Sequence, residues 1–285
     1  MHVKRFRALI ALCVLLVAQW QFNFIGYQLA FYILMGILGA FAIYEILRFV
    51  VILRLRKQVP DLKLSYLTNL HPRYTLNSES ERRAAMASAL YLISETTTNG
   101  PSTSYVNSLE TLDMENADLV KLNRLDIEAA WDISNGDAMR EMINELIERA
   151  QTYEATSLQV LGKQERYQRY FAGYGLVLSD IESHPVTGFD IVRAAWMVRA
   201  GFSIGFLTEE AARGYLALIG ELLAKQFVSW ESLAVSYLVT YSEWNGGLQD
   251  DVGMTMKEYM LKERIIGVKL LLEDSDSPLR QAAFD

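Results

Sequence analysis

Residues 189–244 read FDIVRAAWMVRAGFSIGFLTEEAARGYLALIGELLAKQFVSWESLAVSYLVTYSEW, a mostly apolar stretch interrupted by helix start and stop signals. Thr208 is followed by two glutamates, which predicts the start of a helix because first-turn carboxylates favour the positive end of the helix dipole. Ser229 is expected to cap a further helix that runs to the end of the stretch. Gly201 is expected to close the first helix, Phe189–Ala200, at the usual C-terminal position. The stretch therefore predicts three consecutive helices.

The sequence on both sides of this stretch has the same helical punctuation. Ser78 and Glu81 form a capping box ahead of apolar residues at helical spacing, and Asn135 is expected to cap a helix with one apolar face. No segment alternates convincingly with period two, as a half-buried strand would. We therefore predict an all-α fold, with a connector at residues 58–78 and one multi-helix domain at residues 79–285. Further helices are expected at about Ala117–Ala130, Leu161–Ile181 (one helix or two) and Lys257–Leu272.

The N-terminal part of the chain, residues 1–57, differs sharply from this domain. Its apolar sequence, from Ala8 to Leu53, is too long for one membrane crossing, which needs about 20 residues. We expect one span from about Phe6 to Trp20 and a second from about Ile25 to Tyr44. Polar residues between them supply a turn. The sequence thus predicts a transmembrane helical hairpin that anchors the domain.

The charges that flank the hairpin predict its orientation. Lysines and arginines precede the first span and follow the second, whereas the turn carries no charge. By the positive-inside rule, both ends of the hairpin and the soluble domain face the cytoplasm. Two other interpretations of the first segment stay open: a cleaved signal peptide, and a re-entrant or interfacial segment. Gly36 and Ala40 form a small-residue pair that favours packing within the hairpin over dimerisation.

Composition excludes several classes of function. Residues 58–285 hold 20 basic and 33 acidic residues, so a phosphate backbone would be repelled and no nucleic-acid binding is expected. The same acidity favours a basic protein partner. The only cysteine, Cys13, lies in the first expected span, and none of the three histidines has another histidine or cysteine at ligand spacing. We expect no metal site and no cofactor.

Asp190 and Arg193 are the most informative charged pair in the chain. They lie one turn apart on a helix that is apolar nearly all round, and such a helix is usually buried. A buried arginine needs a partner, because breaking a buried ion pair costs roughly 3–5 kcal/mol. The pair predicts either an internal salt bridge, the interpretation we favour, or a site for a charged ligand.

Tryptophans supply the remaining candidate binding residues. Trp131, Trp196, Trp230 and Trp244 could line a ligand cleft, although large aromatic residues at helical spacing are more often part of a core. Of these, Trp196, Trp230 and Trp244 are assigned to a binding site with Asp190 and Arg193. No glycine-rich phosphate loop, nucleophile elbow, kinase motif or zinc-protease motif is present in the sequence. We assign no catalytic residue, and the sequence holds no positive sign of an enzyme.

The same central stretch resembles a bacterial family of unknown function, the domain family numbered 1266. The resemblance starts with Asp190 and Arg193 as a D-x-x-R helix. It continues through a turn and helix with Gly201, Gly205, Phe206, Leu207, Thr208, Glu210 and Ala211, and then through Phe227, Ser229, Trp230 and Trp244. Trp131 and Ile133 also resemble an earlier W-G-I segment of the family, but Asp132 stands where a glycine is expected. The resemblance covers about residues 80–250; it implies an α-helical domain and brings no activity with it.

These observations together predict a function only in outline. We expect a protein-binding module on the cytoplasmic face of the bacterial inner membrane, and one version is an immunity-type protein that neutralises a basic toxin. The alternative is an enzyme of unknown class, hydrolase-like, that uses the region around Asp190 and Arg193. A third possibility is a structural membrane component that assembles through its hairpin.

Overall fold

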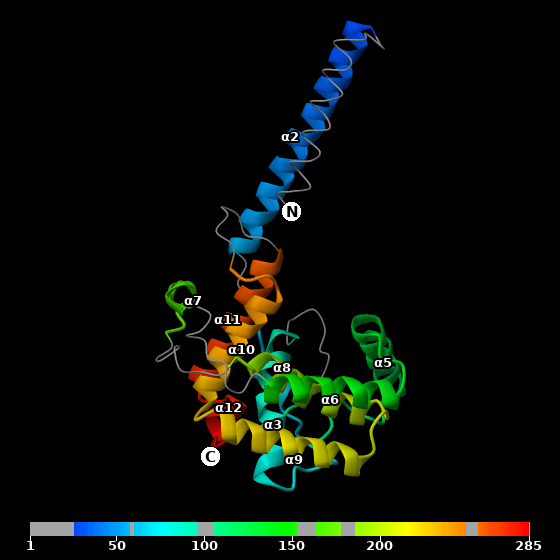
Figure 1. Cartoon of the computed structure of the whole chain (residues 1–285), viewed down its shortest axis with the longest axis vertical. Coiled ribbons are helices and arrows are strands. Elements are labelled where there is room, and N and C mark those ends of the chain that lie inside the picture. Colours follow the sequence, from blue (N-terminus) through cyan, green and yellow to red (C-terminus); the bar gives the residue numbers. More distant parts are fainter. Residues whose placement is uncertain are drawn as a thin grey trace. The chain divides into compact units, whose positions relative to one another are not determined.

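The computed structural model describes residues 26–57, 60–95, 105–152, 164–177, 186–248 and 256–284. Helices and connecting segments make up these residues, and no strand occurs among them (Figure 1). The prediction of an all-α fold is therefore confirmed. The chain divides into two compact units, Met1–Gln58 and Val59–Asp285.

In the first unit, one long helix, α2, covers Tyr27–Lys57. Within it, Tyr32–Val51 forms a 20-residue stretch that is long and apolar enough to cross a membrane, and none of that stretch is buried. The helix begins close to the expected start of the second span and continues past Tyr44 to Lys57. The first expected span, residues 6–20, lies outside the described residues.

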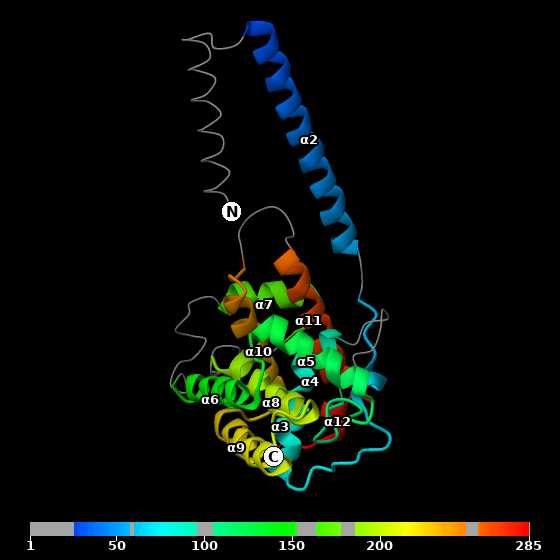
Figure 2. The same ribbon diagram turned by 90° about the vertical axis from the view of Figure 1, so that its right-hand side faces the viewer.

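The second unit is a bundle of helices of unequal length (Figures 1 and 2). The expected connector, residues 58–78, is described from residue 60. It contains a short 3-10 helix, η1, and contributes the fully buried Leu67 to the core. The elements in chain order are η1 (Leu64–Leu67), α3 (Glu79–Ala87), α4 (Ala89–Leu92), η2 (Ile93–Glu95), α5 (Ala117–Trp131), α6 (Gly136–Thr152), α7 (Gln164–Ala172), α8 (Gly188–Ser203), α9 (Glu209–Gln226), α10 (Trp230–Trp244), α11 (Met256–Glu273) and α12 (Pro278–Gln281).

Helix α8 is the centre of this unit. It packs against α3, α4, α6, α9 and α10, while α3 packs on α9 and α10 packs on α11 (Figure 2). Every residue of α8 except Asp190 and Trp196 is buried, as expected for a helix that is apolar nearly all round. The domain core is therefore built around the stretch that opens with Phe189.

Three predicted helix starts are confirmed by hydrogen bonds. Asn135 accepts from the N–H of Asp137 and of Ala138, each at 3.0 Å. Thr208 caps α9, and Ser229 caps α10 in a reciprocal capping box with Ser232. A serine, threonine or asparagine at this position satisfies N–H groups that have no partner inside the helix.

The capping box predicted at the start of α3 forms only in part. Ser78 accepts from the N–H of Glu81 at 3.1 Å. The Glu81 carboxylate, however, accepts from the N–H of Asn77 at 2.7 Å, one residue before the cap. In the aromatic-rich region expected to be helical over residues 161–181, α7 covers Gln164–Ala172, and a turn follows at Gly173–Gly175. Residues 161–163 and 178–181 lie outside the described residues.

The prediction that Gly201 ends the first helix is wrong. Helix α8 continues to Ser203, and the left-handed residue after its end is Gly205, with φ of 77°. The N–H of Phe206 donates to the carbonyl oxygen of Gly201 at 2.8 Å, and the N–H of Gly205 donates to that of Phe202 at 3.0 Å. This pattern defines a Schellman motif. Gly201 instead allows close packing, because a Cβ there would lie 3.0 Å from Cγ of Met139 in α6.

Candidate functional site

Asp190 and Arg193, on the first two turns of α8, are in direct contact. The Arg193 guanidinium donates to the Asp190 carboxylate, and the two side chains are 8% and 21% exposed. Burial lowers the pKa of Arg193, and the neighbouring carboxylate of Asp190 opposes this shift. A second arginine, Arg149 of α6, places its Nε 3.8 Å from the other oxygen of Asp190. The carboxylate thus lies between two guanidinium groups at the border of the core.

Aromatic rings enclose the Arg193 guanidinium. Its central carbon lies 4.0 Å from the ring centroid of Phe189, 5.5 Å from that of Trp131 and 5.7 Å from that of Trp244. Guanidinium groups at such distances are attracted to the electron-rich faces of the rings. Trp244 is 64% exposed, so the cluster reaches the surface on that side.

Trp196 belongs to the same cluster, and Trp230 does not. The Trp196 ring packs on Trp131 and on Tyr91, with centroids 5.8 Å and 4.8 Å away. Trp230 and Trp244 occupy opposite ends of α10, which at 1.5 Å per residue separates them by about 21 Å. The sequence suggested one site for Trp230 and Trp244 because helical periodicity does not show which other helix each end of α10 contacts.

Trp230 instead holds the last part of the described chain. Its indole N–H donates to the carbonyl oxygen of Ala282 at 3.0 Å, and its ring meets Phe284 edge-on at 4.8 Å. Two clefts of about 410 Å³ each border Trp230: one passes Leu271 and Phe284, and the other passes Arg83 and Ala282. Neither cleft includes Asp190 or Arg193.

A fully buried arginine, Arg199, was missed at the sequence level. It follows Arg193 on α8 and donates to the carbonyl oxygens of Tyr105, Ser108 and Glu110 and to the hydroxyl of Ser88. Burial lowers its pKa to about 9, so the guanidinium stays protonated at neutral pH. An arginine inside an apolar helix was the signal that could have drawn attention to it, as it did to Arg193.

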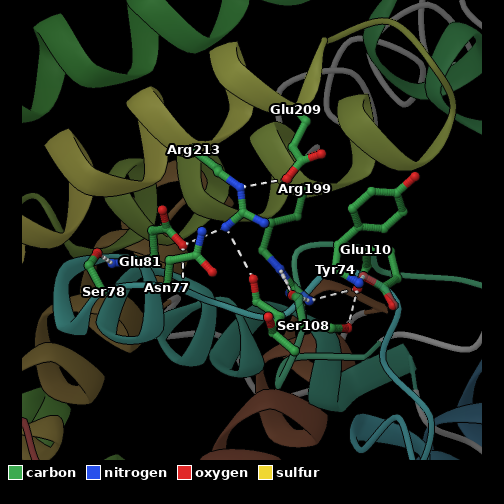
Figure 3. Close-up of polar contacts among 10 residues, drawn as sticks. Tyr74, Asn77, Ser78, Glu81, Ser108, Glu110, Arg199, Glu209 and Arg213 are labelled. Atoms are coloured by element: carbon green, nitrogen blue, oxygen red, sulfur yellow. Dashed lines mark hydrogen bonds and ion pairs between the residues drawn. The ribbon is translucent and has the colours of Figure 1, made fainter.

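The Glu110 side chain binds residues 69–74 to the segment that Arg199 holds (Figure 3). This buried carboxylate accepts from the side-chain amide of Asn69 at 3.1 Å and from the N–H groups of Arg73 and Tyr74 at 2.8 and 3.2 Å. Arg199 and Glu110 therefore hold residues 69–74 and 105–110 against α8. Three donors on one carboxylate and several acceptors on one guanidinium are typical of a structural network.

Two further arginines join helices in the second unit. Arg213 of α9 pairs with Glu81 of α3 at 2.9 Å and with Glu209, one turn earlier, at 2.8 Å (Figure 3). Arg264 of α11 donates to the hydroxyl of Tyr237 and lies 4.3 Å from the ring centroid of Tyr241.

Among the described residues, no group of three histidine, cysteine, aspartate or glutamate side chains could hold a metal ion.

Helix α5 has an unusual surface. Of its fifteen residues only Ile127 is buried, whereas Leu122 and Leu125 are each 52% exposed. Asp118, Asp126 and other carboxylates around these leucines are exposed as well. The sequence predicted the helix but not this surface, because leucines at helical spacing normally indicate a core-facing side.

The geometry defines an all-helical domain built around α8, on a chain that also carries a long apolar helix. The family described as "Protein of unknown function (DUF1266)" matches residues 126–284, from the last turns of α5 to beyond α12. This match covers more than half of the chain, so the chain belongs to that family, as the resemblance indicated. No curated protein and no solved structure matches it.

Proposed function

We propose that this protein is a membrane-anchored protein-binding module. Helix α2 supports the anchoring most directly: its 20-residue apolar stretch leaves large side chains such as Phe41, Ile46 and Phe49 about 60% exposed. Exposed apolar groups on every side of a helix are unfavourable in water and favourable in a lipid bilayer.

We propose that the first expected span, at about residues 6–20, also crosses the membrane, so that residues 1–57 form a hairpin in the bacterial inner membrane. The basic residues at both outer ends, with Arg54 and Arg56 at the end of α2, favour a cytoplasmic location for both termini and for the second unit. The acidic second unit would be repelled by anionic lipid, so the hairpin would supply the attachment.

Labelling of single cysteines tests this topology in the full chain. With Cys13 replaced by serine, a cysteine at Asn23 should react with a membrane-impermeant maleimide in intact cells, because the turn lies outside. A cysteine at the exposed Asp276 should react only after the cells are lysed. Protection of both positions in intact cells would indicate a re-entrant first segment and contradict the hairpin.

Protein binding follows from the charge of the second unit and from helix α5. Twenty basic and 33 acidic residues after position 57 favour a basic partner, and α5 exposes leucines among carboxylates. An immunity-type role, in which the partner is a basic toxin, is one version of this proposal. Affinity capture of the full-length protein from its own membranes should recover one stoichiometric partner; capture of intact, folded protein alone would contradict the proposal.

Ligand binding or catalysis near Arg193 is the second candidate. It is favoured by one observation, the position of a buried guanidinium beside the exposed ring of Trp244. Against it, the guanidinium is already paired with Asp190. Replacing Asp190 with asparagine distinguishes the two interpretations. Lost activity with unchanged melting would support a ligand site, and a large drop in melting temperature would support a structural salt bridge.

A further inference from the structure

Helix α5 is attached to the domain along only one side. Arg124 donates from Nε to the carbonyl oxygen of Ile204 at 2.7 Å and stacks over Phe206 at 5.5 Å, and Ile127 and Trp131 pack inward. In Figure 1 the helix lies at the edge of the second unit, next to the end of α6. The remaining side of α5 is therefore free of covering elements within the described part of the unit.

The outer side of α5 carries an apolar stripe. Leu122, Leu125 and Ala129 are exposed and are spaced by three and four residues, so they share one face opposite the buried Ile127. Leu122 and Leu125 are each half exposed, so a partner that covered them would gain hydrophobic stabilisation. Apolar surface surrounded by polar residues marks interaction sites.

Carboxylates surround this stripe. Six acidic residues and two basic ones lie between Asp113 and Asp132, and all six carboxylate side chains are exposed. One of the two basic residues, Arg124, is engaged with Ile204 on the inner side. The other basic residue, Lys121, is exposed, so the border of the apolar stripe holds one lysine beside three carboxylates, those of Asp118, Asp126 and Glu128, and is negatively charged overall.

We propose that this surface, Asp118–Ala129 of α5, binds a basic amphipathic helix of a protein partner. The inference rests on the proposed protein-binding function and names the surface and the chemistry of the partner. A helix fits because its ridge of apolar side chains can pack beside Leu122 and Leu125, while its lysines and arginines meet Asp118, Asp126 and Glu128. A second copy of this chain would bring carboxylates against carboxylates, which is unfavourable.

Site-specific photocrosslinking of the full-length protein in its own membranes tests the location. A photoreactive phenylalanine at position 122 or 125 should crosslink to one protein, through a segment that is basic and amphipathic. The control position is Leu218, an exposed leucine of α9, and it should give no such product. Crosslinks only to a second copy of the chain, or to a segment without basic residues, would overturn the proposal.

A defined probe tests the chemistry. An 18-residue helical peptide of leucine and lysine should bind the full-length protein in detergent, whereas the same peptide with glutamate in place of lysine should not.

The double variants Leu122→Ser/Leu125→Ser and Asp126→Lys/Glu128→Lys should each weaken binding of the lysine peptide about tenfold or more. Matched controls are Leu218→Ser on α9 and Glu141→Lys/Glu148→Lys on the exposed side of α6. Equal binding by variants and controls would overturn the proposal.

The two proposals fail in different ways. If the full-length protein captures a stoichiometric partner and the α5 variants retain it, protein binding stands and the α5 surface is wrong. If no partner is captured at all, the proposed function itself fails. Unchanged melting temperatures of the α5 variants are expected, because the replaced side chains are exposed.

Discussion

The side chain of Arg199 forms two hydrogen bonds with the carbonyl oxygen of Ser108, from Nε at 3.1 Å and from the terminal nitrogen at 2.8 Å. The two residues are 91 positions apart in the sequence. Helix α8 therefore does more than pack apolar side chains. The Arg199 guanidinium donates hydrogen bonds to carbonyl oxygens of the largely buried segment 105–110, which is neither helix nor sheet and so lacks regular backbone partners.

Replacing Arg199 with methionine should strongly destabilise the domain. The change keeps the apolar part of the side chain and leaves several buried acceptors without a donor, which we expect to cost about 3 kcal/mol or more of unfolding free energy. Arg140→Met is the matched control, because that side chain is 45% exposed and its one ion-pair partner among the described residues is its neighbour Asp137. Thermal unfolding of the full chain in detergent compares them, and equal melting would show that the network is not stabilising.

The Asp190→Asn variant measures the role of the paired Arg193. If the pair is a structural salt bridge, loss of the charge should lower the unfolding free energy by about 2 kcal/mol, because a side chain only 8% exposed then holds an uncompensated charge. Adding Arg193→Met should recover part of that loss. Melting that is unchanged by Asp190→Asn would instead favour a ligand site.

Gly220 and Gly214 of α9 should respond to alanine in opposite directions. A Cβ on Gly220 would lie 2.0 Å from the carbonyl oxygen of Ser80, where α3 and α9 pack together, whereas a Cβ on Gly214 meets nothing within 4 Å. Gly220→Ala should therefore destabilise by about 1–3 kcal/mol through overpacking. Gly214→Ala should stabilise by up to about 1 kcal/mol, since alanine is the better helix former. Denaturant unfolding of both variants checks the opposite signs.

Asp132 can be tested through its backbone conformation. It is the one described residue other than glycine with positive φ, 58°, and it ends helix α5. Asp132→Gly should be neutral or stabilise by about 0.5 kcal/mol, and Asp132→Val should destabilise by about 1–2 kcal/mol, because a β-branched side chain is strained there. The left-handed conformation would explain why the family's W-G-I segment has glycine where this chain has Asp132. Equal stability of the two variants would contradict that explanation.

Much of the local structure could be predicted because its causes lie within a few residues. The caps at Asn135, Thr208 and Ser229 satisfy N–H groups two or three positions away, and the structure confirms all three. The burial of the helix around Asp190 and Arg193 followed from its composition in the same way. Gly201 was misjudged because a glycine can end a helix or allow a neighbouring helix to approach, and only the position of Met139 distinguishes the two.

The candidate site was predicted only in part, for the same reason. Asp190 and Arg193 are one turn apart, so their contact could be expected. Trp196 joins them through Trp131 of α5, and Trp244 of α10 contacts Arg193 directly. Trp230 lies at the far end of α10, and its partners, Ala282 and Phe284, come from the end of the described chain. No periodicity in the sequence carries that information.

The sequence by itself determined the longer helices, the N-terminal caps at Asn135, Thr208 and Ser229 and the apolar character of residues 27–57, because propensity, capping and hydrophobicity act between neighbours in the chain. Only the tertiary structure decided which carbonyl oxygens Arg199 bonds, where glycines allow helices to touch, and that Leu122 and Leu125 of α5 face outward. Those outcomes depend on groups tens of residues away, whose positions follow from the packing of the whole domain.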